Sequence, residues 1–506
     1  MIYGPSRVYR DGFFILLIRM THYRFISTTT KCSKSSCVNN GGLVNLCDSY
    51  RHANRAFYRT TLLLAFSFFW ALTQVQGQTE LNARSHRQLQ ELVEFNEVFG
   101  QGHTGFCLYD ADYQIFLHGY NADRLFVPAS NVKLLTFYLA NRILGHRTPA
   151  LFYQEFPDHI EAWGTGYPLT LHPAFTGYDE LGPWLLNQRK PMVLNFPSGN
   201  ATLARYGPGW SWDDYNDSYV YERSAFPLYG NRLFLDLSPT DAEGRQSLLG
   251  APPSIAGTLR QVPGQEASIQ RSEFGNDFTV GPGFYESDKF PIERPIHLTP
   301  FLLSNELSAA YPALRVSSGQ KNYPPDHTLN IVEASLPDTV FRRMLQDSDN
   351  YLAEQLLLQA SVRRFTSPDT EGIINYARDT LLPAIGIENF RWVDGSGLSR
   401  YNLFTPRHMT RLVMALDQEV GRDRLISLLA AGGESGTLKE RFDNKPEAYV
   451  WAKTGSLSGV VCVSGLLKTV RGKWLAFSFM HNNFVGSSRS YYDEMQKTLS
   501  WCYQNL

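Results

Sequence analysis

The chain has 506 residues, with 47 basic and 48 acidic side chains and a formal net charge of −1. This balance provides no long-range attraction to nucleic acid or to anionic membranes, so electrostatics alone indicates no partner. With 43% hydrophobic, 13% aromatic and 19% charged residues, the composition is that of a folded globular protein. It excludes a disordered or collagen-like chain, and the length predicts two or more domains.

A secretory signal peptide is predicted some distance after the first residue. Three arginines precede an apolar run over residues 60–72, and Val75 and Gly77 follow at the expected positions of a cleavage site. A basic region, an apolar core and small residues in this order are typical of a signal peptide. The run is shorter than the roughly 20 residues that span a bilayer. We therefore expect export to the periplasm or the medium after cleavage near Gly77, with no stable membrane anchor. Residues 1–77 would be an upstream extension plus the signal peptide.

Metal and cofactor motifs are missing from the sequence. The mature chain would keep Cys107, Cys462 and Cys502, which form neither a disulfide framework nor a metal site and permit at most one bridge. The segment Gly100–Gly105 matches G-x-G-x-x-G, yet it leads from an expected helix into a strand, the reverse of a dinucleotide site. We find no H-E-x-x-H, G-K-[ST] or G-x-S-x-G. No metal and no cofactor are expected.

Hydrophobic periodicity predicts helices and strands at both ends of the chain and short elements between them. From 147 to 300 the pattern breaks into pieces rich in Pro, Gly and aromatic residues, which favour short strands and loops. The two ends are therefore predicted to form one α/β unit that a β-rich insertion interrupts. The elements expected in chain order are helix 80–99, strands 106–109 and 114–117, helix 128–144, helices 351–362 and 405–415, strands 460–467 and 474–480, and helix 491–503.

The first motif that indicates chemistry is Ser130-Asn131-Val132-Lys133, at the expected start of a helix. A separation of three places both side chains on one helical face, where the amine of Lys133 could take the proton of Ser130 as the hydroxyl attacks a carbonyl. The pattern is common, because Ser318 and Lys321 match it in an expected loop. Alone, it would indicate only a helix-start serine and a surface lysine.

Two further motifs indicate that the first motif has a catalytic role. Ser348-Asp349-Asn350 leads into an expected helix, and Lys453-Thr454-Gly455 begins an expected strand. A second S-x-N at Ser198-Gly199-Asn200 lies in a Pro and Gly-rich loop with no helix behind it. Three elements in the order S-x-x-K, S-x-N and K-T-G, each on a helix start or a strand, indicate acyl transfer to a serine.

With these motifs the sequence resembles the serine penicillin-recognising enzymes. Within them it resembles the D-alanyl-D-alanine carboxypeptidase/endopeptidase family of the penicillin-binding protein 4 type, peptidase family S13. The long interval between Lys133 and Ser348 leaves room for the large insertion of that family. Segments 208–214, 394–400 and 436–441 also match, and the resemblance covers the chain after residue 77.

The resemblance implies an α/β (α+β) fold. We expect a serine β-lactamase/transpeptidase-like domain with an antiparallel sheet flanked by helices. Its N-terminal part would be residues 78–146 and its C-terminal part residues 301–506, with the large β-rich insertion over 147–300.

The resemblance also assigns catalytic roles. Ser130 would be the nucleophile, and Lys133 the general base, with its pKa lowered by partial burial and by the nearby positive charge of Lys453. Ser348 would relay a proton to the leaving nitrogen. Asn350 would hydrogen-bond Lys133 and the substrate amide.

Substrate-binding roles follow from the same resemblance. Lys453 and Thr454 would hold the terminal carboxylate of the substrate, and Gly455 would let the substrate lie against the strand. The backbone N–H groups of Ser130 and Ser456 would form the oxyanion hole. Asp214 would contact the third side chain of a stem peptide, and Arg400 would lie near the cleft.

The implied function is a peptidase that trims terminal D-Ala from peptidoglycan stem peptides or cuts their D-Ala cross-links. β-Lactam antibiotics would acylate Ser130 as covalent inhibitors, and nucleic acid would not be a partner. Two alternatives stay open: a β-lactamase or esterase on the same scaffold, and a non-catalytic peptidoglycan-binding protein.

Overall fold

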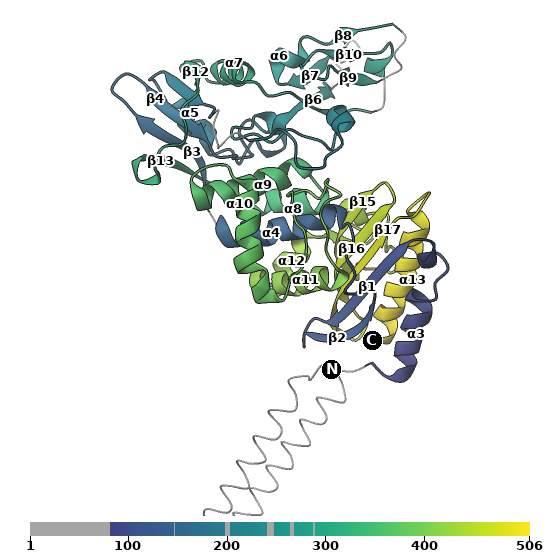
Figure 1. Ribbon diagram of the computed structural model, residues 1–506. Helices are drawn as coiled ribbons and strands as arrows, with labels where there is room; N and C mark the ends of the chain where they lie inside the picture. The colour runs from purple at the N-terminus through teal and green to yellow at the C-terminus, as the bar shows by residue number, and fades with distance from the viewer. Residues whose placement is uncertain (1–80, 146, 198–202, 240–246, 264–267, 287–288) are drawn as a thin grey trace, which may run out of the picture. The chain divides into compact units, whose positions relative to one another are not determined.

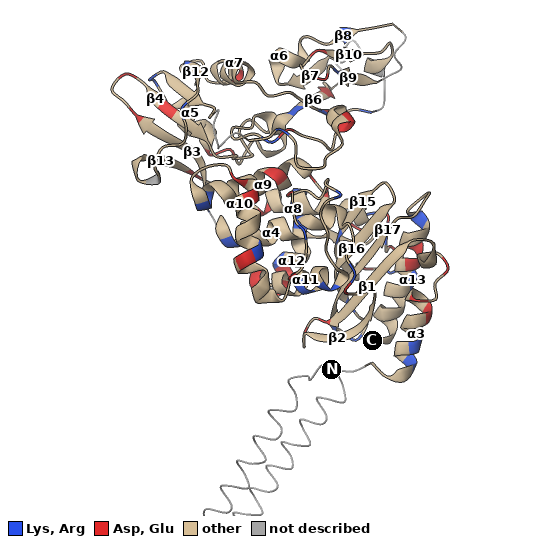
Figure 2. Ribbon diagram, in the orientation of Figure 1, with Lys and Arg blue, Asp and Glu red and all other residues tan. Residues whose placement is uncertain are grey.

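The computed structural model describes residues 81–506, apart from 146, 198–202, 240–246, 264–267 and 287–288 (Figure 1). Of two compact units, Met1–Gln78 and Thr79–Leu506, the second contains every element below. The predicted signal peptide and the motif Ser198-Gly199-Asn200 lie outside the described residues. Among the residues that are described, no helix is both long and apolar enough to cross a membrane. Acidic and basic residues are interspersed over the described elements (Figure 2).

The described unit contains a six-stranded antiparallel sheet in the order β14-β15-β16-β17-β1-β2. The hairpin β1–β2, near the start of this unit, pairs through β1 with β17, so the two ends of the chain build one sheet. The three long C-terminal strands are mostly buried apolar residues because helices cover both faces of the sheet. Strand bounds are β1 His103–Asp110, β2 Ile115–Tyr120, β14 Ala430–Ala431, β15 Val450–Leu457, β16 Val460–Lys468 and β17 Trp474–Asn482.

Two helices, α3 (Ala83–Val93) and α13 (Arg489–Asn505), pack on one face of this sheet and share a hydrophobic core with it (Figure 1). The other face is covered by α11 (Pro406–Val420). Its first turn is well specified, because Thr405 and His408 form a reciprocal capping box and Pro406 fits the first helical position.

A layer of helices lies beyond α11 and carries two of the three motifs. The central pair is α4 (Val132–Ile143) and α9 (Asn350–Phe365), which pack against each other and are buried over most of their length. Around them lie α8 Asp338–Gln346, α10 Thr370–Tyr376 and α12 Arg422–Leu428. Such helices, buried on all sides, form only within a large core.

The segment after residue 146 forms three smaller sheets, as the fragmented pattern predicts. A five-stranded sheet has the order β12-β5-β4-β3-β13, and two three-stranded sheets have the orders β11-β6-β7 and β8-β10-β9. The two small sheets share a separate core. Strand bounds are β3 Arg147–Glu155, β4 Ile160–Gly164, β5 Met192–Asn195, β6 Arg232–Leu237, β7 Leu248–Ala251, β8 Arg260–Gln261, β9 Ile269–Arg271, β10 Phe278–Val280, β11 Ile292–Pro295, β12 Val316–Gly319 and β13 Asn330–Ser335. The helices here are α5 Leu181–Leu186, α6 Pro253–Ala256 and α7 Pro300–Ala310.

Strand pairing corrects two details of the sequence interpretation. The predicted limit of the insertion at residue 300 divides the five-stranded sheet, because β12 pairs with β5 and β13 pairs with β3. We propose a limit near residue 335, and the insertion below means residues 147–335. Ser318, in the second S-x-x-K, lies on β12 and not in a loop.

Candidate active site

Ser130 lies in the short 3₁₀ helix η2 (Ala129–Asn131), directly before α4. The preceding Ala129 has a φ of 46°, in the left-handed region that residues with a Cβ seldom adopt. Ser130 is half-buried, whereas both of its neighbours are completely buried. The turn therefore presents one serine from an otherwise buried segment.

Lys133 contributes an amine that has no exposure to solvent. Its Nζ donates to Oγ of Ser130 (2.9 Å), to Oδ1 of Asn350 (2.5 Å) and to the carbonyl oxygen of Ser396 (2.7 Å). Burial lowers the pKa of Lys133 to about 7, although three nearby carboxylates oppose this shift. An amine with this pKa is neutral in a large fraction of molecules at neutral pH, so it can accept the proton of Ser130.

This finding corrects the predicted cause of the shift. We expected the charge of Lys453 to help lower the pKa of Lys133, but burial lowers it and the charges that act on it are carboxylates. Instead, Lys133 affects Lys453: burial and then the charge of Lys133 lower the pKa of Lys453 well below its ordinary value.

Lys453, on β15, forms a second pair of an amine and a hydroxyl. Its Nζ donates to Oγ of Ser348 (3.0 Å) and to the carbonyl oxygen of Thr454 (2.8 Å). Ser348 precedes α9 and has a left-handed φ of 63°. Asn350 follows in the first turn, where its Nδ2 donates to the carbonyl oxygen of Tyr219 (2.8 Å). The S-x-N motif thus contacts both lysines.

Gly455 has a structural role in addition to the one expected. A Cβ added there would lie 2.7 Å from the carbonyl oxygen of Pro128 and 2.9 Å from the amide nitrogen of Ser130. The absence of a side chain lets β15 approach the turn that carries Ser130. A side chain at position 455 would therefore collide with this turn, as well as with the substrate that we expected it to obstruct.

A cavity of about 750 Å³ opens above these residues. Lys133, Lys453 and Gly455 do not line it; they lie behind it. Segments far apart in the sequence contribute to its wall, including part of the insertion. The lining residues are Ser130, Gly209, Trp210, Ser211, Asp214, Tyr219, Val220, Asp347, Ser348, Asn350, Gly397, Leu398, Arg400, Thr437, Thr454, Ser456, Leu457 and Ser458.

Four predicted substrate-binding residues line this cavity at separate places. Asp214 lies in the short helix η4 (Trp212–Asn216) of the insertion, and burial raises the pKa of its carboxyl. Arg400 is exposed and donates from Nη2 to the carbonyl oxygen of Ser458 (2.7 Å). Thr454 donates to Oγ1 of Thr437 (2.8 Å), and Ser456 is exposed at the edge of β15.

Two buried carboxylates near Lys133 were not predicted. Asp394 accepts hydrogen bonds from the backbone N–H groups of Gly397 (3.0 Å) and Ser399 (2.7 Å) and from Nδ2 of Asn402 (2.7 Å). It also accepts one from Nε1 of Trp210 (2.9 Å), which ties the insertion to this loop. The second carboxylate, Glu354, accepts from the N–H of Ser396 (2.7 Å).

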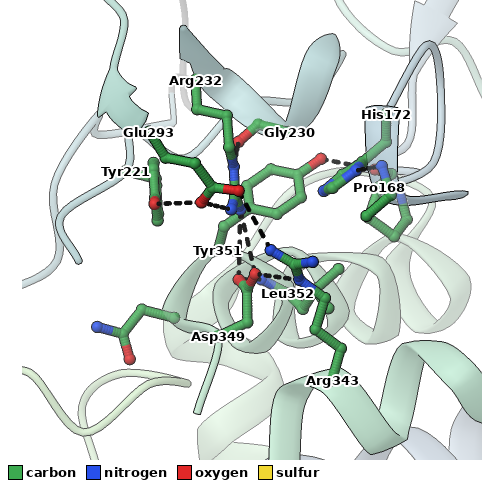
Figure 3. A network of polar contacts seen from close by, with 12 residues as sticks. Pro168, His172, Tyr221, Gly230, Arg232, Glu293, Arg343, Asp349, Tyr351 and Leu352 are labelled. Carbon is green, nitrogen blue, oxygen red and sulfur yellow. Dashed lines mark hydrogen bonds and ion pairs between the residues drawn. The ribbon is translucent and has the colours of Figure 1, made fainter. Parts of the chain in front are cut away.

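Asp349, the middle residue of S-x-N, belongs to a buried ion network (Figure 3). Its carboxylate lies 3.2 Å from Arg232 and 3.0 Å from Arg343, and it caps α9 by accepting from the N–H of Leu352 (3.0 Å). Arg232 comes from β6 of the insertion and also pairs with Glu293 at 2.6 Å. Burial alone would raise the pKa of Asp349, but the two arginines outweigh it and hold that pKa well below its usual range.

Comparison with known proteins places the chain in a family. The sequence profile described as the D-Ala-D-Ala carboxypeptidase 3 (S13) family matches residues 200–502, more than half of the chain. The chain belongs to this S13 family. The matched segment contains the S-x-N and K-T-G motifs, and Ser130 and Lys133 precede it.

Curated relatives match over shorter segments. A carboxypeptidase of Mycobacterium tuberculosis is 32% identical over 169 residues, which cover 32% of this chain and 36% of the relative. The D-alanyl-D-alanine carboxypeptidase DacB of Haemophilus influenzae is 30% identical over 154 residues, 29% of this chain and 32% of the relative. These matches span about a third of each relative's length.

Similarity to solved structures extends over most of the S13 chain. The crystal structure of penicillin binding protein 4 from Haemophilus influenzae has a TM-score of 0.63 and 18% identity, and the match covers 84% of this chain and 100% of that one. The same protein complexed with a novel β-lactam has a TM-score of 0.59 and 17% identity, with the same coverage. These similarities confirm the expected transpeptidase-like fold.

We predict that Gly455→Ala destabilises this S13 protein. Because the added methyl group would collide with the backbone of Pro128 and Ser130, either β15 or η2 must move, and we expect the free energy of unfolding to fall by about 1–3 kcal/mol. Urea unfolding followed by tryptophan fluorescence measures it. Gly100→Ala is the matched control, since nothing lies within 4 Å of a Cβ there. Equal stability of both variants would contradict the prediction.

We predict a larger loss of stability for Arg232→Met. It leaves Asp349, with only 5% of its side chain exposed, without one of its two arginine partners, so we expect the free energy of unfolding to fall by about 3–5 kcal/mol. The same urea experiment measures it. Arg260→Met, also in the insertion, is the control, because Arg260 and its partner Asp277 are both mostly exposed and its effect should stay within about 0.5 kcal/mol. A loss no larger than that of the control would show that Arg232 does not hold Asp349.

Proposed function

We propose that this chain is a serine-type D-Ala-D-Ala carboxypeptidase or endopeptidase that acts on peptidoglycan stem peptides through an acyl-enzyme on Ser130. The observation that carries the proposal is the 2.9 Å contact between Oγ of Ser130 and the buried Nζ of Lys133, at the wall of a cavity of about 750 Å³. Membership in the S13 family supports this choice of substrate.

Acylation begins when Oγ of Ser130 attacks the carbonyl carbon between the two D-Ala residues and its proton passes to neutral Lys133. The backbone N–H groups of Ser130 and Ser456 stabilise the negative oxygen of the tetrahedral intermediate. The C–N bond then breaks, and the proton that Lys133 took from Ser130 passes through Ser348 to the leaving amine. Water hydrolyses the resulting ester, and one proton of that water restores the hydroxyl of Ser130.

The relay through Ser348 is supported by its contact with Lys453. The Nζ of Lys453 donates to Oγ of Ser348 at 3.0 Å. The hydroxyl that passes the proton to the leaving amine is therefore held in place by a hydrogen bond. Thr454 lines the cavity beside Ser348 and offers a hydroxyl to the terminal carboxylate of the substrate, while Lys453, in its protonated form, attracts that carboxylate. Asn350 links the buried Lys133 to the cavity. Its Oδ1 accepts from Nζ of Lys133, and the residue also lines the cavity.

The substrate would meet the insertion as well as the motifs. Asp214 carries its carboxylate into the cavity wall and would contact the third side chain of the stem peptide. Arg400 lies beside Ser458 at the border of a second groove of about 530 Å³, which shares Arg400, Ser456, Leu457 and Ser458 with the first. We propose that Arg400 contacts the substrate there.

The proposed cellular location follows from the substrate. Peptidoglycan lies outside the cytoplasm, and the apolar run over residues 60–72 after three arginines supports export. We propose a periplasmic or secreted mature protein after cleavage near Gly77.

The first test is covalent labelling by benzylpenicillin, whose strained amide and carboxylate match the D-Ala-D-Ala end of the substrate. We expect intact mass spectrometry to show a lasting adduct of the mass of the drug, and peptide mapping to place it on Ser130. Ser130→Ala, the matched control, should remain unlabelled. Drug destroyed without a lasting adduct would favour a β-lactamase, and drug left intact would contradict the proposed acyl-enzyme.

The second test is the pH dependence of acylation. Protonated Lys133 cannot accept a proton, so the acylation rate constant should rise with pH, with a midpoint near the pKa of Lys133, about 7. Lys133→Arg keeps a permanent charge and should lower the rate by at least about 100-fold at every pH. Stopped-flow measurements with a chromogenic cephalosporin supply both values. A flat profile would contradict the role of Lys133 as the base.

A further inference from the structure

Glu354 stands one helical turn after Asn350 on α9, so both side chains lie on the face of the helix that looks toward Lys133. Asn350 contacts Lys133 directly. Glu354 reaches it through one residue: its Oε1 accepts from the N–H of Ser396 at 2.7 Å, and the carbonyl oxygen of Ser396 accepts from Nζ of Lys133 at 2.7 Å. The backbone of Ser396 therefore connects a carboxylate to the amine.

The second oxygen of Glu354 is buried. Glu354 is only 2% exposed, and its Oε2 has no hydrogen-bond partner among the described residues. Arg223 of the insertion is its nearest cation, with Nη1 at 4.0 Å. The side chain of Arg223 is engaged elsewhere, since it donates to the carbonyl oxygens of Ala204 (3.1 Å) and Tyr206 (2.9 Å). The charge of Glu354 is thus only partly compensated.

The charged groups near Glu354 and Lys133 come from the loop after residue 393, the start of α9, β15 and the insertion. Asp394 from the loop after residue 393, Glu354 from α9 and Asp349 at the start of α9 raise the pKa of Lys133 against its burial. Lys453 from β15 is a second buried amine, and burial and the charge of Lys133 lower its pKa well below its ordinary value. Burial, and then the charge of Asp394, raise the pKa of Glu354 to about 7, against the effect of Arg223. Glu354 and Lys133 thus change charge in the same pH range, and their titrations are linked.

We propose that Glu354 is a positioning residue of the acylation step, which acts on Lys133 through the backbone of Ser396, and that its negative charge sets how strongly Lys133 holds a proton. This inference rests on the proposed function of Ser130 and Lys133. An ionised Glu354 stabilises the ammonium group that forms when Lys133 takes the proton of Ser130. Where Glu354 is ionised, the same charge keeps Lys133 protonated, and therefore inactive as a base, up to a higher pH.

Two opposite effects follow for Glu354→Gln, which keeps an oxygen for Ser396 and removes the charge. Lys133 should lose its proton at lower pH, so the midpoint of the acylation profile should move down by roughly 0.5–1 unit. Lys133 also becomes a weaker base, so the rate at the high-pH plateau should fall by about 3-fold to 10-fold. A purely structural role would lower the rate without moving the midpoint.

The experiment measures acylation by a chromogenic cephalosporin from about pH 5 to about pH 9, with the full chain. Glu354→Asp retains a carboxylate and should keep the midpoint of the unaltered protein. Glu161→Gln is the matched control, because Glu161 is a similarly buried carboxylate whose partners, Lys321, Asn195 and His159, all lie in the insertion. Its midpoint should not move. The inference is overturned by a Glu354→Gln midpoint within about 0.2 unit of the unaltered protein, or by an equal shift in Glu354→Asp.

A second measurement is independent of activity and of whether Glu354→Gln folds. In unaltered protein labelled with ¹³C at the lysine Cε, the signal of Lys133, identified by its loss in Lys133→Arg, should titrate in two steps because Glu354 ionises in the same range. A single step would overturn the inference. If the unaltered protein is acylated at no pH, the proposed function fails; if it is acylated while Lys133 titrates in one step, only the role of Glu354 fails.

Discussion

The complete burial of the Lys133 amine is the constraint on which the rest of the site depends. A buried amine is tolerated only if its hydrogen-bonding capacity is used and its charge is stabilised or removed. Here Ser130, Asn350 and Ser396 supply the three acceptors, from η2, α9 and the loop after residue 393. Because these segments lie far apart in the sequence, the fold must bring all three together before the amine can become a base.

The insertion helps to hold the residues around Lys133 in place. Three of its contacts reach the motifs or the loop beside them: Arg232 pairs with Asp349, the carbonyl of Tyr219 accepts from Asn350, and Trp210 donates to Asp394. Each holds a residue that itself contacts or surrounds Lys133. A change in the insertion can therefore alter the surroundings of Lys133 without changing any residue of the three motifs.

Much of the fold and the three motifs could be predicted from the sequence, because periodicity and the order of short motifs are local properties. The hairpin, α4, α9, α11, β16, β17 and α13 all lie where expected. Local patterns do not predict which residues from distant parts of the chain become neighbours in the fold. Gly455 proved to accommodate the backbone of Ser130, and the end of the insertion depended on strand pairing. An available signal for Glu354 was its position four residues after Asn350 in an otherwise largely apolar helix.

The pairing of β1 with β17 has a consequence for the order of events during synthesis. Until the segment 450–482 has been made, β1 has no neighbour on one side, and α11 has most of its sheet face missing. Contacts of such long sequence separation form late. The turn that carries Ser130 and strand β15 therefore meet only after β15 has been made, so a chain that ends before residue 450 contains no assembled candidate site.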